Sequence, residues 1–123
     1  MLDRLQAMQR ALEGRPHLAR IGALFSETAL LKVDGREFYL EFDRGRLARI
    51  AEGPSKKIPW RFALTTDGEA LEAFWGATPA PGFHDIFAMA KIGRAEISGD
   101  ILVLVKNLRF FKEFMALGRE VSA

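Results

Sequence analysis

Apolar residues fill two faces of the segment 101–117, which their spacing predicts to be a helix. A helix on the surface of a globular protein has one apolar stripe and leaves its other faces polar. A single sheet can cover only one face of a helix, so the second face needs other cover. A neighbouring helix, a second subunit or a ligand could each provide it. The apolar residues of the segment are Ile101, Leu102, Val103, Leu104, Val105, Leu108, Phe110, Phe111, Phe114, Met115, Ala116 and Leu117.

The start of the chain predicts one helix and then a hairpin. Apolar residues at near-helical spacing indicate an amphipathic helix over residues 2–13, which Gly14 ends, and residues 16–20 form a connection. A strand region at about 23–33 then leads to Asp34-Gly35, the strongest short signal for a two-residue β-hairpin turn.

Strict alternation marks the partner strand, residues 37–42. Phe38, Leu40 and Phe42 point to one face of the predicted sheet. The alternate residues, Glu37, Tyr39 and Glu41, point to the other face. A tight turn at 43–45 leads into a third strand at 46–51. After a polar loop, residues 60–66 form a fourth strand.

The pattern changes to a helical period after the fourth strand. Thr66 followed by Glu69 fits a capping box at the start of a short helix over 67–75. A loop rich in glycine and proline separates this helix from a second one at 83–91. A fifth strand follows at 93–97, and Ser98 or Asp100 caps the terminal helix.

This order of elements indicates an α+β fold, because strands come first and helices follow. We expect a five-stranded, mostly antiparallel sheet with helices packed on one face. The chain divides into an N-terminal amphipathic helix and connection at 1–20, a main domain at 21–117 and a tail at 118–123.

Composition narrows the class of protein. A length of 123 residues predicts one domain, and the lack of cysteine excludes disulfides, thiolate metal sites and thiol catalysis. The N-terminus is charged early and lacks the apolar run of a secretory signal. No stretch approaches the ~20 apolar residues of a transmembrane helix. We therefore expect a cytoplasmic protein.

The net charge of +2 points to no particular partner, but one stretch is strongly basic. A solvated hairpin edge explains such a stretch, since lysine and arginine guard exposed strand edges. Contact with an anionic membrane or an acidic ligand headgroup is the alternative. No nucleic-acid-binding motif is present, so we expect no nucleic-acid partner. The basic residues are Arg44, Arg46, Arg49, Lys56, Lys57 and Arg61.

No arrangement of residues supports catalysis. His17 and His84 lie far apart in the sequence, and neither has the spacing of a metal site. The serines lack the context of a nucleophile elbow, and the glycines lack the spacing of a dinucleotide site. We expect a protein that is not an enzyme, with no metal site and no cofactor.

Aromatic residues gather in or beside the three helices that must share one face of the sheet. Each buried ring removes about 150–250 Å² from water, so an exposed cluster would be costly. Either the helices close over a dry core, or the cluster lines a pocket for an apolar ligand. The residues are Phe74, Trp75, Phe83, Phe87, Phe110, Phe111 and Phe114.

Two short motifs frame the helices after the fourth strand. Asp67, Leu71 and Gly76 mark the first short helix, and residues 93–100 follow the pattern G-x-x-x-I-x-G-D. With the order of strands and helices, they make the segment 21–114, about three-quarters of the chain, resemble the sterol carrier protein type-2 (SCP-2-like) family of lipid-binding domains. On this resemblance the main domain 21–117 is an SCP-2-like lipid-binding domain.

The resemblance implies non-catalytic binding or transfer of a hydrophobic lipid in a tunnel between the sheet and the helices. The ligand could be a sterol, an acyl chain or a similar apolar molecule. Lys106, Arg109 and Lys112 at three-residue spacing could steer the protein to transient contact with anionic membranes. The alternative is a homodimeric or enzyme-accessory interaction module whose apolar helix face is buried by a partner. The implied ligand-binding residues are Leu71, Phe74, Trp75, Phe83, Phe87, Met89, Leu104, Leu108 and Phe111.

Overall fold

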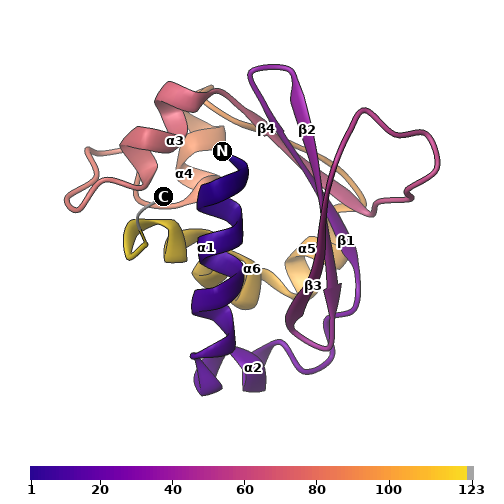
Figure 1. Cartoon of the computed structure of the whole chain (residues 1–123). Helices are drawn as coiled ribbons and strands as arrows, with labels where there is room; N and C mark the ends of the chain where they lie inside the picture. The colour runs from indigo at the N-terminus through magenta and orange to yellow at the C-terminus, as the bar shows by residue number, and fades with distance from the viewer. Residues whose placement is uncertain (122–123) are drawn as a thin grey trace.

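A sheet forms one layer of the structure and helices form the other (Figure 1). The computed structural model describes residues 1–121, so the last two residues of the predicted tail lie outside the described part. The strands are β1 (Thr28–Val33), β2 (Arg36–Asp43), β3 (Arg46–Glu52), β4 (Phe62–Thr66) and β5 (Glu96–Gly99). Their order in the sheet is β3-β2-β1-β4-β5, and every neighbouring pair is antiparallel except β1 and β4. The predicted five-stranded, mostly antiparallel sheet is confirmed.

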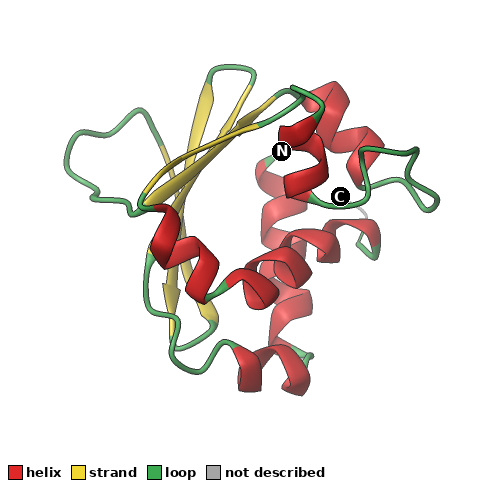
Figure 2. Cartoon of the chain, turned by 180° about the vertical axis from the view of Figure 1, so that it is seen from behind, coloured by secondary structure: helices red, strands yellow, loops and turns green. Residues whose placement is uncertain are grey.

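The helices lie on one face of the sheet, as predicted (Figure 2). They are α1 (Leu2–Glu13), α2 (Pro16–Ile21), α3 (Gly68–Phe74), α4 (Ile86–Lys91), α5 (Ile101–Lys106), α6 (Leu108–Ala116) and the short 3-10 helix η1 (Leu117–Arg119). One buried core joins them to the inward side chains of the sheet, including Phe38, Leu40 and Phe42. Within residues 1–121, no helix is both long and apolar enough to cross a bilayer.

The hairpin between β1 and β2 forms where the sequence predicts it. Asp34 and Gly35 have φ angles of 53° and 81°, the left-handed conformations that a tight two-residue hairpin turn requires. The turn sets the register in which Leu31 pairs with Phe38. The polar face of β2 is turned the other way, where Tyr39 is nevertheless buried in a small cluster with Leu30.

The connection before β1 is more ordered than the sequence predicts. Residues 16–20 belong to α2, where Pro16 occupies the first helical position. The strand expected at 23–33 begins only at Thr28, because Phe25 turns into the core. Its amide donates to the carbonyl of Gly22 (2.8 Å), and its carbonyl accepts from the amide of Gly45 (3.0 Å). These backbone groups are therefore not available to the sheet.

The capping box predicted from Thr66 and Glu69 is wrong. The N-cap of α3 is Asp67, whose carboxylate accepts a hydrogen bond from the amide of Ala70 (2.7 Å). The hydroxyl of Thr66 donates instead to the carbonyl of Arg94 (2.8 Å), because β4 continues through Thr66 and brings it beside the start of β5. The helix therefore begins one residue later than predicted.

Both α4 and β5 also begin later than predicted. α4 starts at Ile86, where Asp85 caps it by accepting from the amide of Ala88 (2.8 Å). The amide of Arg94 donates to a carbonyl in α4 (2.9 Å), so Gly93 and Arg94 form the turn that follows the end of that helix. β5 consequently spans Glu96–Gly99 instead of residues 93–97.

The terminal helix is broken into α5 and α6 at Asn107. The side-chain amide of Asn107 donates to the carbonyl of Val103 (2.9 Å), and its φ of −119° leaves the helical region. Asparagine side chains compete with the helical hydrogen bonds of the backbone. Asp100, one of the two predicted caps, accepts from the amide of Val103 (3.3 Å) and starts α5. The break lets α6 bury its rings while α5 buries only Leu104.

The basic stretch at 44–61 is largely neutralised by ion pairs. Because β3 is an edge strand, its arginines extend from an exposed edge toward acids on neighbouring elements. The solvated-edge interpretation therefore describes this stretch better than a basic binding patch. The pairs are Arg44 with Asp43, Arg46 with Glu13, Arg49 with Glu41, and Arg61 with Glu27 and Asp100.

Candidate apolar ligand site

Phenylalanine rings fill the space between the sheet and α6. The ring centroids of Phe62 and Phe111 are 5.0 Å apart, and those of Phe42 and Phe114 are 5.1 Å apart. Such separations are direct contacts between rings. We call this group the phenylalanine cluster; its members are Phe25, Phe42, Phe62, Phe110, Phe111 and Phe114, all buried.

Eight of the nine predicted ligand-binding residues belong to the core that contains this cluster. Phe83 and Phe87 are half-buried at its edge. Leu108 is placed differently, because it lines a groove on the surface of α5 and α6. The six that are buried are Leu71, Phe74, Trp75, Met89, Leu104 and Phe111.

Trp75 holds the end of α3 against the C-terminal segment. Its indole Nε1 donates to the carbonyl of Met115 (2.8 Å), which lies near the end of α6. The guanidinium of Arg4 lies 5.0 Å from the ring and also donates to the carbonyl of Gly118 (2.9 Å). Arginine over an aromatic face adds a cation–π attraction. Trp75 is thus a rigid part of the wall around the core.

Arg119 fixes the loop between α3 and α4 from the other side. Its guanidinium donates to the carbonyl of Phe74 (2.7 Å) and to the carbonyl of His84 (2.8 Å). The same group lies 4.6 Å from the ring of Phe74. One side chain of η1 therefore joins the end of α3 to the residues just before α4. Nothing in the local sequence marks Arg119 for this role.

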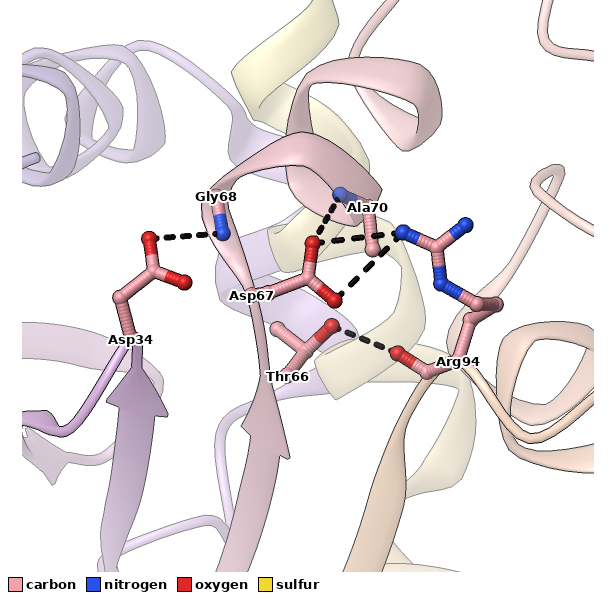
Figure 3. Close-up of polar contacts among 6 residues, drawn as sticks. All are labelled: Asp34, Thr66, Asp67, Gly68, Ala70 and Arg94. Carbon is pink, nitrogen blue, oxygen red and sulfur yellow. Dashed lines mark hydrogen bonds and ion pairs between the residues drawn. The ribbon is translucent and has the colours of Figure 1, made fainter.

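A polar cluster holds the start of α3, as Figure 3 shows. Asp34, in the β1–β2 turn, accepts a hydrogen bond from the amide of Gly68 (3.0 Å). Asp67 caps the helix and forms an ion pair with Arg94 (3.3 Å). Thr66 donates to the backbone of the same arginine. These contacts join β1, β4 and β5 to α3, and we assign them a structural role.

An open groove of about 530 Å³ lies beside Leu108. Arg109 pairs with Glu113 across one turn of α6 (3.1 Å), and Lys112 pairs with Asp85 at the start of α4 (3.5 Å). Burial raises the pKa of the Asp85 carboxyl, but the amide of Ala88 and the ammonium of Lys112 outweigh it and hold that pKa below its usual range. The lining residues are Val105, Lys106, Leu108, Arg109, Lys112 and Glu113.

The two histidines have surface positions. His17 is exposed, and its Nε2 lies 3.5 Å from Glu113. His84 is exposed and accepts from Arg119 through its backbone carbonyl. Within residues 1–121, no group of three or more histidine, aspartate and glutamate side chains is placed to hold a metal ion.

Comparison with known proteins finds similarity only in structure. No protein-family model and no curated protein matches the sequence. Matching solved structures include sterol carrier protein 2, with a TM-score of 0.76 and 16% identity over 98% of this chain and 96% of that chain. The chain has the fold of sterol carrier protein 2. The resemblance seen in the sequence is therefore confirmed at the level of the fold.

Two further structures share the sterol carrier protein 2 fold. One is a conserved hypothetical protein from Thermus thermophilus, itself a candidate sterol carrier protein, with a TM-score of 0.76 and 16% identity over 100% of this chain and 89% of that chain. The other is UbiJ-SCP2, a ubiquinone synthesis protein, with a TM-score of 0.60 and 18% identity over 90% of this chain and 88% of that chain. At sequence identities of 16–18%, these structural matches show a shared fold and nothing further about this chain.

None of the nine predicted ligand-binding residues comes from a strand of the sheet. The alternation of β2 and β4 predicts inward positions for Phe42 and Phe62, and this signal could have placed both in the site. Phe25 has no such signal, because it lies in a segment without regular secondary structure. In this chain the three rings contact phenylalanines of α6 and complete the phenylalanine cluster.

Proposed function

We propose that the protein binds a lipid or other apolar small molecule between the sheet and helices α3, α4 and α6, without catalysing a reaction. The observation that carries the proposal is the phenylalanine cluster in the interior of a fold shared with sterol carrier protein 2. A sterol, an acyl chain or a similar ligand matches such apolar surroundings. Residues 21–117 are the proposed binding unit, and the nine predicted residues, with the phenylalanine cluster, are its proposed walls.

Ligand uptake requires the rings of the cluster to move, because they are in mutual contact. The helices that cover the site are short: α4 buries only Ile86 and Met89, and α5 buries only Leu104. Elements held by few buried apolar side chains open at the lowest cost in free energy. We therefore assign opening to α4 and α5, with Phe83 and Phe87 at the half-buried edge where a ligand would first contact the core.

Burial of the ligand supplies the driving force for such opening. At about 25 cal/mol per Å² of apolar surface, a contact of about 300 Å² is worth about 7 kcal/mol before the entropic costs of binding. Rings that move aside and then pack on the ligand regain much of their own contact area. A tail of moderate length can therefore offset the rearrangement.

Native mass spectrometry tests the proposal directly. For protein purified without detergent, we expect a bound apolar molecule, and solvent extraction followed by mass spectrometry would identify its chemical class. The stripped protein should then bind cis-parinaric acid, a fluorescent fatty acid, in titration. Protein that carries no apolar molecule and does not bind cis-parinaric acid would contradict the proposal.

A single substitution tests the proposed place of binding. Leu108→Trp adds bulk at a half-buried position that lines the surface groove, at the one predicted site residue outside the common core. We expect weaker binding of cis-parinaric acid with the fold unchanged in circular dichroism. Leu24→Trp is the matched control, because Leu24 is 95% exposed and a ring there meets only solvent. Equal affinity of the Leu108→Trp variant and the wild type would remove Leu108 from the site.

A second candidate function is an accessory role, in which the domain holds the apolar tail of a substrate for another enzyme. The observation that favours it is the fold shared with UbiJ-SCP2, a ubiquinone synthesis protein. The molecule extracted from the purified protein separates the two candidates. A polyprenyl-type tail with a reactive head would favour the accessory role, and ordinary acyl lipids would favour the carrier.

A further inference from the structure

α5 exposes apolar side chains on the side away from the core. Leu102 is 71% exposed, Val105 is 51% exposed and Ile101 is 41% exposed, whereas only Leu104 is buried. Large side chains left in water this way commonly mark a surface that meets another apolar phase. The second apolar face of the terminal segment is therefore not covered within residues 1–121.

Trp60 extends this apolar surface beyond α5. It is 38% exposed, and its ring lies against Gly99, at the junction of β5 and α5. Arg61 fixes the junction, because its carbonyl accepts from the amide of Asp100 (2.6 Å) and its guanidinium pairs with the carboxylate of Asp100 (2.9 Å). Figure 2 shows the loop before β4 and α5 on the same side of the structure.

The apolar surface borders the basic groove beside Leu108. Three cations, Lys106, Arg109 and Lys112, line this groove together with one carboxylate, Glu113. Lys106 is exposed and forms no ion pair within residues 1–121. Arg109 and Lys112 pair with Glu113 and Asp85, so Lys106 carries the positive charge of the groove that no ion pair within the described residues offsets.

We propose that this surface docks on an anionic lipid bilayer. We call it the α5 surface; it consists of Trp60, Ile101, Leu102, Val105, Lys106, Arg109 and Lys112. Exposed aliphatic side chains can enter the region between headgroups and acyl chains, and lysine and arginine beside them meet anionic headgroups. A tryptophan at the edge suits the boundary between water and lipid. The positive charge and the exposed apolar side chains of this surface thus both fit an anionic bilayer.

Charge complementarity argues against a second copy of the chain as the occupant. A two-fold interface places the same patch on both subunits, so the charge of Lys106, which no ion pair within the described residues offsets, would meet a patch of the same net sign. Like charges brought together across an interface are unfavourable. The headgroups of an anionic bilayer carry the opposite charge, and its apolar interior can accept the side chains of Leu102 and Val105.

The inference does not depend on the proposed ligand site, because the residues that carry it lie outside the phenylalanine cluster. Its test is sedimentation of the full chain with vesicles. We expect binding to vesicles of equimolar phosphatidylcholine and phosphatidylglycerol, little binding to phosphatidylcholine alone, and weaker binding at high salt.

Two variants test the two halves of the α5 surface. Leu102→Gln/Val105→Gln removes the apolar contact and should lower the affinity for the anionic vesicles about tenfold. Lys106→Glu reverses one charge and should lower it about fivefold or more. Both changes are at exposed positions, so the thermal unfolding midpoint should stay near that of the wild type.

Each variant has a matched control elsewhere on the chain. Arg10→Glu makes the same change in net charge as Lys106→Glu but lies exposed on α1, which Figure 1 shows in the foreground with α5 farther back. Ile92→Gln changes an apolar residue that is 49% exposed after α4. We expect both controls to bind the anionic vesicles like the wild type.

Three outcomes would overturn the proposal. One is vesicle binding that the α5 variants leave unchanged. Another is an equal loss in Arg10→Glu, which would assign binding to net charge alone. The third is a dimer in analytical ultracentrifugation that Leu102→Gln/Val105→Gln converts to a monomer, since a second copy would then cover α5. If the wild-type protein binds the anionic vesicles but does not bind cis-parinaric acid, the proposed ligand site is rejected and the docking surface stands.

Discussion

Gly118 lies directly against the indole of Trp75, with no room for a β-carbon between them. The same indole donates to the carbonyl of Met115 and lies under the guanidinium of Arg4. Residues from α1, the end of α3, the end of α6 and η1 therefore meet at one side chain. This junction holds the α3 wall of the candidate site in place.

We predict that Gly118→Ala destabilises the protein because the added methyl group overlaps the indole of Trp75. Overpacking of a tight contact costs about 1–3 kcal/mol in the free energy of unfolding. Urea denaturation at neutral pH, followed by circular dichroism, measures the change.

The control for this prediction is a double-mutant cycle with Trp75→Leu. The smaller leucine leaves space for the methyl group, so Gly118→Ala should cost much less in that background. We expect the two substitutions to be coupled by about 1 kcal/mol or more. Additive effects would show that something other than the indole requires glycine at position 118.

Features of the fold with a strong local signal were predictable from the sequence. Asp34-Gly35 requires a tight turn, and the alternation through Phe38 and Phe42 identifies the buried face of β2. The departures arise from contacts between distant segments. Phe25 leaves the strand because the core accepts its ring, and Asn107 breaks the terminal helix through its own side-chain hydrogen bond.

The candidate site was predictable mainly on its helical side. Aromatic spacing places Phe74 and Phe111 on helices, and both are buried in the common core. Spacing cannot tell how far each helix continues, so Leu108, assigned to the interior, lines the surface groove after the break. The junction at Trp75 depends on residues about 40 or more positions away in sequence, which a local pattern does not contain.

Gly99 and Gly93 offer a matched test of the turn that ends β5. Both have positive φ angles, 91° and 78°, but a β-carbon on Gly99 would meet the carbonyl of Arg61 at 2.6 Å, whereas Gly93 has open space. We predict that Gly93→Ala costs about 1–2 kcal/mol and Gly99→Ala about 3 kcal/mol or more. Equal losses in urea denaturation would mean that backbone conformation alone, and not close packing, requires Gly99.

Two of the predicted ligand-binding residues should differ in their contribution to stability. Phe111 is buried and its ring contacts those of Phe42, Phe62 and Phe114, whereas Phe87 is half-buried. We predict that Phe111→Ala lowers the free energy of unfolding by about 3–5 kcal/mol. Phe87→Ala should cost about 1 kcal/mol. Similar losses in chemical denaturation would place Phe87 in the rigid core and not at its opening edge.

The ion pair that holds the start of α5 should make stability depend on pH. The guanidinium of Arg61 and the amide of Val103 lower the pKa of the Asp100 carboxyl, and burial opposes them only in part. The folded pKa therefore lies below the unfolded value of about 3.9. The stabilising contribution of the carboxylate is present above that unfolded value and is lost as the pH falls through the folded one.

Asp100→Asn should consequently be less stable than the wild type at about pH 7, and the difference should shrink as the pH falls below the unfolded value of about 3.9 and the wild-type carboxyl takes up its proton. Urea midpoints measured from neutral to acid pH check this. Arg61→Gln removes the main cause of the lowered pKa, so Asp100→Asn should cost less in that background. A difference that stays constant from neutral to acid pH would show that the charge of Asp100 does not cause it.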